Sequence, residues 1–452
     1  MTVIELGEFN APSEPGEPAG RAEFNPRSVR RALIAAVALV SAMVLGGAAR
    51  PGDPLVHDIW SAPMTEQDSM TVREDGIFVF RGTGATTVEL TAYETATGAV
   101  RWRRDSPGRI NWMYPGAAAG LLLIPGDEKW ANLEFDDGGQ GLLSYGGTTT
   151  ALESTTGRQL WKTAGDVQAV ASSSVLLGER DSHGDYVTVR LVDARTGAEI
   201  WRRPAGGALH LNVQDEGPSP ILVILADKTG RTTVLRFADG SVIKERRLPW
   251  SATDVQNGVD TYLSIADDLV LVSRNTLKKA TVTAYRAGSL ERLWETDMSP
   301  YAYIVECGPI LCHADGSSLF GIDPRTGRQL WERPGDGGGV IQVGDRLITA
   351  ENADPPRQSV VDPLTGEQAG TGGIGYPVRA EAYEGSVLLL HRVYGQGPMR
   401  DAVDYLDLKT GEITRVGLLG SSADMQQGWR CDSTGRYLAC QREDRLVVTA
   451  VG

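Results

Sequence analysis

The chain has 452 residues, of which 41% are hydrophobic, 23% charged and 7% aromatic, with 54 glycines and a formal net charge of −14. A charged fraction near one quarter and 10 tryptophans exclude a wholly disordered or low-complexity chain. The acidic balance argues against a nucleic-acid partner, because neutralising phosphates needs clustered Lys and Arg side chains. Length alone allows one large globular unit or two to three smaller ones.

The first expected element is a transmembrane helix over residues 32–49, which carry no charge. At helical rise this segment spans about 27 Å, close to the hydrocarbon thickness of a bilayer. Arg30 and Arg31 precede it, so the positive-inside bias predicts a signal anchor with a cytoplasmic N-terminus. Residues 1–31 are rich in Pro, Gly and Glu and are expected to form a disordered cytoplasmic tail. A signal peptide cleaved near residues 47–49 is the alternative.

One pattern recurs after the anchor, a Gly followed four positions later by Trp. The best copies cover residues 91–102, 150–161, 191–201 and 321–331. Degenerate copies centre on Gly240, Leu290, Gly366 and Gly411. Successive centres lie 37 to 59 residues apart, around the spacing of four-stranded propeller blades.

Each copy is expected to be a strand, a tight turn and a second strand. The turn glycine is free to take positive φ, and the Trp on the outgoing strand needs a neighbouring blade to bury its ring. The predicted turn glycines are Gly98, Gly157, Gly197, Gly327, Gly366 and Gly411. The predicted blade-docking tryptophans are Trp60, Trp102, Trp161, Trp201, Trp294 and Trp331.

These residues resemble the tryptophan-docking motif of the pyrroloquinoline-quinone-like (PQQ-like) β-propeller repeat family, which includes the BamB-like propeller of outer-membrane protein assembly. The resemblance implies an all-β, quinoprotein-like propeller over residues 55–452. The orientation of the anchor would place this propeller on the extracytoplasmic side. Residues 57–60 and 445–452 are expected to pair and close the ring. Eight copies plus this composite would give nine blades; we expect eight, with one incomplete copy or with the closing strand in blade eight.

Four cysteines fall in two close pairs, Cys307 with Cys312 and Cys431 with Cys440. Outside the membrane an even count predicts disulfides; three connectivities are possible and two local bridges are favoured. A metal site using Cys307, Cys312 and His313 is the alternative, although the spacing matches no common zinc pattern.

Quinoprotein dehydrogenases of the related family use two adjacent cysteines, a Trp floor and a Ca²⁺ ion. This chain has no Cys-Cys pair and no nucleophile, zinc or phosphate-loop motif. We therefore expect no catalytic, cofactor-binding or metal-binding residues, and no cofactor.

The longest interval between copies carries an insertion with an acidic cluster and two aromatic residues. A candidate partner-binding loop there contains Trp130, Glu134, Asp136 and Asp137. A weak Ca²⁺ site or a merely solvated loop are the alternatives, and residues 181–185 are a similar, weaker candidate.

Together these features predict an eight-bladed propeller attached to the cell membrane by one helix. The expected function is binding or scaffolding of other envelope proteins without catalysis. The alternative is a quinone- or metal-dependent oxidoreductase of the quinoprotein dehydrogenase superfamily.

Overall fold

The computed structural model describes residues 55–452 except 83–86, 108–119, 135–139, 217–218, 252, 254–256, 301–302, 379–383, 394–399 and 421–429. The predicted tail and transmembrane helix, residues 1–31 and 32–49, lie outside the described residues. Within the described part, every regular element is a β-strand, and no helix has the length and hydropathy that a membrane span requires. Residues Leu55–Gly452 form one compact unit.

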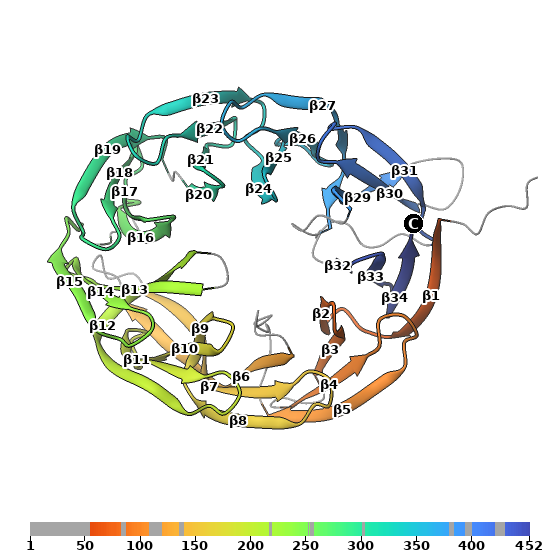
Figure 1. Cartoon of the computed structure of the whole chain (residues 1–452), viewed down its shortest axis with the longest axis horizontal. Helices are drawn as coiled ribbons and strands as arrows, with labels where there is room; N and C mark the ends of the chain where they lie inside the picture. The colour runs from red at the N-terminus through yellow and green to blue at the C-terminus, as the bar shows by residue number, and fades with distance from the viewer. Residues whose placement is uncertain are drawn as a thin grey trace, which may run out of the picture. The chain divides into compact units, whose positions relative to one another are not determined.

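The described strands form antiparallel sheets arranged around a ring (Figure 1). Six sheets have four strands. The first two are β2 (Ser69–Arg73), β3 (Gly76–Gly82), β4 (Thr87–Tyr93) and β5 (Val100–Pro107), then β16 (Asp260–Ala266), β17 (Leu269–Asn275), β18 (Ala280–Arg286) and β19 (Arg292–Met298). The next two are β20 (Tyr303–Cys307), β21 (Ile310–Ala314), β22 (Ser318–Ile322) and β23 (Gln329–Pro334), then β24 (Gly339–Val343), β25 (Arg346–Ala350), β26 (Arg357–Val361) and β27 (Gln368–Ile374). The last two are β28 (Tyr376–Pro377), β29 (Ser386–Val393), β30 (Arg400–Asp407) and β31 (Ile413–Leu418), then β32 (Cys431–Thr434), β33 (Tyr437–Arg442) and β34 (Arg445–Val451) with β1 (Val56–Pro63).

Two sheets depart from this pattern. One has three strands, β6 (Leu121–Glu134), β7 (Gln140–Glu153) and β8 (Gln159–Ala164). The other has seven, β9 (Asp166–Val170), β10 (Ser174–Arg180), β11 (Tyr186–Asp193), β12 (Glu199–Glu216), β13 (Ser219–Asp227), β14 (Arg231–Arg236) and β15 (Val242–Arg247).

The seven-stranded sheet contains two repeats joined by β12. The first part of β12 pairs with β11 as the outer strand of one repeat, and the part after Ala208 pairs with β13 as the inner strand of the next. Counting it twice, the described sheets contain nine repeats. The predicted count of eight blades is therefore wrong. The closing strands form a ninth repeat and do not complete the eighth. Each of the eight motif copies in the sequence corresponds to a repeat of its own.

The ring is closed by strands from opposite ends of the described region. Strand β1 pairs with β34, from Val56 opposite Val451 to Pro63 opposite Arg445. The buried Arg442 guanidinium donates to both carboxylate oxygens of Asp58, at 3.0 and 3.1 Å. This pairing joins β1 to a sheet and covers the edge of β34 that β33 leaves open, so the two ends of the described chain close the ring.

Tryptophans join neighbouring repeats. The indole Nε1 of Trp102 donates to the backbone oxygen of Ser154 in the next repeat at 2.8 Å. Its ring lies against Gly157, whose φ is +68° and whose Cβ, if present, would come within 2.6 Å of that ring. Only glycine satisfies both the left-handed backbone and the close approach. The equivalent pairs are Trp60 with Thr95, Trp161 with Ala194, Trp201 with Phe237, Trp294 with Pro324 and Trp331 with Pro363.

Other junctions use different contacts. Between β15 and the following repeat, Arg246 donates to the backbone oxygen of Leu290 at 2.8 Å, and Leu290 holds the turn position with φ +55°. At Gly411, the space that a Cβ would need is taken by the Ala369 backbone oxygen and not by a Trp ring.

The apolar core lies between neighbouring sheets and not at the centre of the ring. One cluster joins Phe78, Leu90 and Trp102 of one repeat to Leu122 and Leu152 of the next. Each sheet buries its faces against two neighbours, so no single repeat is a stable unit.

Candidate functional site

The predicted insertion is a long β-hairpin. Strands β6 and β7 pair along their whole length, from Leu121 opposite Glu153 to Glu134 opposite Gln140. Strand β8 pairs with β7 only between Thr148 and Leu152. Residues 128–134 and 140–146, the distal hairpin from here on, therefore extend beyond the three-stranded part of the sheet.

The distal hairpin has one exposed face. Trp130 pairs with Ser144 and Asn132 with Leu142, so these four side chains share a face. Trp130 is 57% exposed and Leu142 is 68% exposed. Of the other predicted residues of this segment, Glu134 ends β6, whereas Asp136 and Asp137 lie outside the described residues.

The opposite face packs against the turn at residues 181–185. A Cβ on Gly184 would come within 2.9 Å of the Leu133 side chain and 3.2 Å of that of Leu143. The Tyr145 hydroxyl donates to the Asp181 backbone oxygen at 3.0 Å. The structure thus brings together two segments that the sequence presented as separate candidates.

The Asp181 carboxylate is engaged within its own turn. Its Oδ1 accepts the backbone N–H groups of His183 and Asp185, at 2.9 and 3.1 Å. This is the geometry of an Asx turn, which explains the acidic residue without a bound cation.

A polar network lies next to this turn. The Arg180 guanidinium stands 3.6 Å from the centre of the Tyr186 ring and donates to the Tyr186 hydroxyl and the Gly184 oxygen. The Tyr186 hydroxyl donates to Gln168 at 2.6 Å. Stacking and charge-assisted hydrogen bonds hold strands β9, β10 and β11 in register next to the hairpin.

Two buried titratable groups flank that network. Burial raises the pKa of Asp166 to about 6, outweighing the backbone N–H groups of Val167 and Gly146, which favour the carboxylate. Burial, with the nearby Arg180 charge, lowers the pKa of His210 to about 4. His210 is therefore neutral at pH 7, with its ring centre 5.4 Å from that of Trp250. Sequence motifs gave no sign of this group, because its members come from strands β9 to β12 and from residues beyond them.

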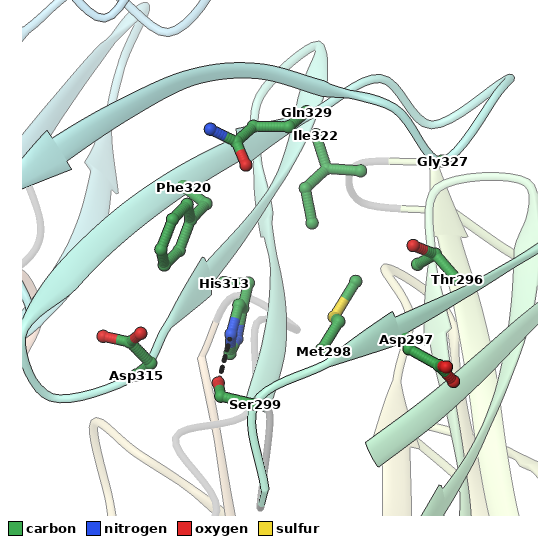
Figure 2. A pocket seen from close by; sticks show the side chains of 10 residues that line it. All are labelled: Thr296, Asp297, Met298, Ser299, His313, Asp315, Phe320, Ile322, Gly327 and Gln329. Atoms are coloured by element: carbon green, nitrogen blue, oxygen red, sulfur yellow. Dashed lines mark hydrogen bonds between the residues drawn. The ribbon is translucent and has the colours of Figure 1, made fainter. Parts of the chain in front are cut away.

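A cavity of about 220 Å³ lies where β19 faces the sheet β20–β23. Figure 2 shows its lining residues, Thr296, Asp297, Met298, Ser299, His313, Asp315, Phe320, Ile322, Gly327 and Gln329. His313 Nε2 lies 3.0 Å from the Ser299 hydroxyl, and its ring stacks on Phe320 with the centres 5.5 Å apart. Burial would raise the pKa of Asp315, but the backbone N–H groups of Ser318 and Ser317 lower it. Asp315 thus stays ionised at the cavity wall.

Both local disulfides are present, Cys307–Cys312 and Cys431–Cys440. The second links residues directly opposite each other in β32 and β33. Because Cys307 and Cys312 are bonded to each other, neither offers a thiolate, and the alternative metal site with His313 is wrong. Across the described residues, no group of three or more His, Cys, Asp or Glu side chains is arranged to hold a metal ion.

Three solved structures are similar to this chain. They are BamB from Moraxella catarrhalis (TM-score 0.43, 12% identity, 80% of this chain and 99% of that chain covered), the computationally designed Ika8 protein (0.42, 14%, 76% and 96%) and quinohemoprotein alcohol dehydrogenase from Comamonas testosteroni (0.35, 14%, 83% and 78%). At these scores none of them supports a statement about activity.

The sequence itself matches a family model. The model described as outer membrane protein assembly factor BamB matches residues 57–180, 134–299 and 187–346, which together cover more than half of the chain. This chain therefore belongs to the BamB family of PQQ-like β-propeller proteins.

Proposed function

We propose that this chain is a membrane-anchored, extracytoplasmic propeller that binds or scaffolds other proteins of the cell envelope without catalysing a reaction. The distal hairpin carries this proposal, because it places Trp130 and Leu142 in solvent on one face. Exposed aromatic residues on a rigid support are typical of protein-binding surfaces.

The remaining features agree with this role and place. Two disulfides are typical of proteins that fold in an oxidising compartment. The uncharged segment 32–49 after Arg30 and Arg31 supports a signal anchor with the propeller outside. Trp102, Trp161 and Trp201 are hydrogen-bonded between blades, which supports a structural use of the repeat tryptophans over a role as the floor of a quinone site.

Protease treatment of intact cells tests the topology. We expect the protease to cleave the propeller while an epitope at the N-terminus stays intact. Survival of the propeller with loss of the N-terminal epitope would show the opposite orientation.

Titration of the purified full chain with pyrroloquinoline quinone and Ca²⁺ tests the absence of catalysis. We expect no saturable binding and no turnover of a dye electron acceptor. Stoichiometric binding with turnover would replace the scaffold role by the oxidoreductase alternative.

A further inference from the structure

We propose that the exposed face of the distal hairpin, formed by Glu128, Trp130, Asn132, Leu142 and Ser144, docks on a protein surface with an apolar pocket edged by Lys or Arg side chains. This inference rests on the proposed function and adds the chemistry of the partner.

Trp130 and Leu142 form one apolar contact area. Their direct partners across the hairpin are Ser144 and Asn132, so the two apolar residues are diagonal neighbours on the same face. Diagonal cross-strand side chains lie about 7 Å apart, within reach of an indole ring. One pocket on a partner would therefore cover both.

The exposure of Trp130 contrasts with that of the tryptophans used between blades. Trp102, Trp161 and Trp201 are 9%, 7% and 8% exposed, whereas Trp130 is 57% exposed. Burying an indole is among the largest single contributions to an interface, and Trp is enriched at the centres of binding surfaces.

The hairpin is held in place before any partner arrives. Its covered face contacts Gly184 through Leu133 and Leu143, and Tyr145 is hydrogen-bonded to Asp181. A surface that is already ordered loses little conformational entropy on binding.

Among the described side chains of this face, Glu128 is the one that carries a charge. Glu128 lies on the exposed face, where its carboxylate accepts the Ser144 hydroxyl at 2.6 Å. Lys129 is exposed but belongs to the opposite face, where it pairs with Tyr145, and Lys162 is paired with Asp127 at 3.1 Å. Negative charge favours a basic protein edge and disfavours an anionic lipid surface.

Site-specific photocrosslinking in membranes tests this docking. The full chain would carry benzoylphenylalanine at Asn132 on the exposed face or, as a control, at Ile243, which is 39% exposed on β15. We expect a protein adduct from position 132, reduced at least tenfold by Trp130→Ala with Leu142→Ala. The matched pair Val242→Ala with Ile243→Ala should leave the yield from position 132 unchanged.

Binding of the crosslinked protein, once purified, tests the charge argument. We expect affinity for the full chain to fall as salt rises, and Glu128→Lys to weaken it at low salt. An adduct that persists in the Trp130 and Leu142 variant, a lipid adduct, or tighter binding by Glu128→Lys would overturn the inference. Protein adducts from position 243 without any from position 132 would also overturn this inference, but the proposed function would still stand. Turnover with quinone would overturn the proposed function itself.

Discussion

At the scale of single residues, Asp166 has the most strongly shifted pKa among the carboxyl groups of the described residues. It is 7% exposed, at the start of β9, and its Oδ1 accepts the Val167 N–H at 3.1 Å. Because burial penalises the ionised form, its pKa rises from 3.8 to about 6. Between these pH values the folded chain keeps a proton that the unfolded chain has released. The free energy of unfolding contributed by this group therefore falls as pH rises through that window.

Asp166→Asn should raise the stability of the chain at pH 8 by on the order of 1 to 3 kcal/mol, because the amide keeps an acceptor for Val167 and carries no charge to bury. The gain should shrink as pH falls below about 6 and disappear well below the unfolded-state pKa of 3.8, where the carboxyl is protonated in both states. Denaturant midpoints of the full chain, followed by circular dichroism, measure the difference. Asp239→Asn is the control of opposite sign, since a hydrogen bond from Ser241 lowers the pKa of Asp239. A loss of stability in Asp166→Asn at pH 8 would contradict the burial argument.

At the scale of elements, the ring depends on the fit between a Trp on one repeat and a turn on the next. Gly157 and Gly344 both have positive φ, +68° and +61°. A Cβ on Gly157 meets the Trp102 ring, whereas a Cβ on Gly344 meets nothing within 4 Å. The two positions separate the cost of the backbone conformation from the cost of losing the close contact.

Gly344→Ala should therefore cost about 1 kcal/mol of unfolding free energy, the usual penalty for a side chain at positive φ. Gly157→Ala should cost about 1 to 3 kcal/mol more, because the ring must move. Equilibrium unfolding of both variants measures this difference. In the Trp102→Ala background the extra cost at Gly157 should vanish. Equal costs at the two glycines would mean that the indole contact carries no stability.

At the scale of the whole molecule, a few interactions between residues nearly 400 positions apart keep the ring closed. Arg442 is 1% exposed at its side chain and its guanidinium is paired with Asp58. The Thr449 hydroxyl also donates to Asp58, at 2.6 Å. Removing the carboxylate would leave a buried cation without its counter-charge.

Because the Asp58 side chain is 43% exposed, solvent weakens this ion pair, and Asp58→Ala should cost about 1 to 3 kcal/mol and open the pairing of β1 with β34. We expect a lower denaturant midpoint and faster proteolysis within β1. Ser61→Ala, which removes an exposed hydrogen bond from Arg445 in the same strand pair, should change stability by less than about 0.5 kcal/mol. Similar behaviour of the two variants would show that closure does not depend on the Arg442 pair.

The propeller fold was predictable because each Gly-to-Trp repeat is local in sequence. The eight motif copies and the composite of both chain ends already add up to the nine repeats found. The expected count of eight was wrong because it treated one copy as incomplete or placed the closing strand in blade eight, whereas β32 to β34 form a separate sheet with β1. Trp130 was predicted as part of a loop. The exposed face of the hairpin follows from the pairing of Trp130 with Ser144. The packing of Leu133 against Gly184 depends on how two repeats meet, and local sequence patterns do not encode that contact.

Strand β12 sets a limit on how this ring could have changed in evolution. Where each repeat is a separate sheet, a gene duplication or deletion adds or removes a repeat without cutting a strand. A breakpoint between the two repeats that share β12 would divide one continuous strand of 18 residues. The segment from Asp166 to Arg247 therefore has to be inherited as a pair, so changes in repeat number are expected elsewhere in the ring.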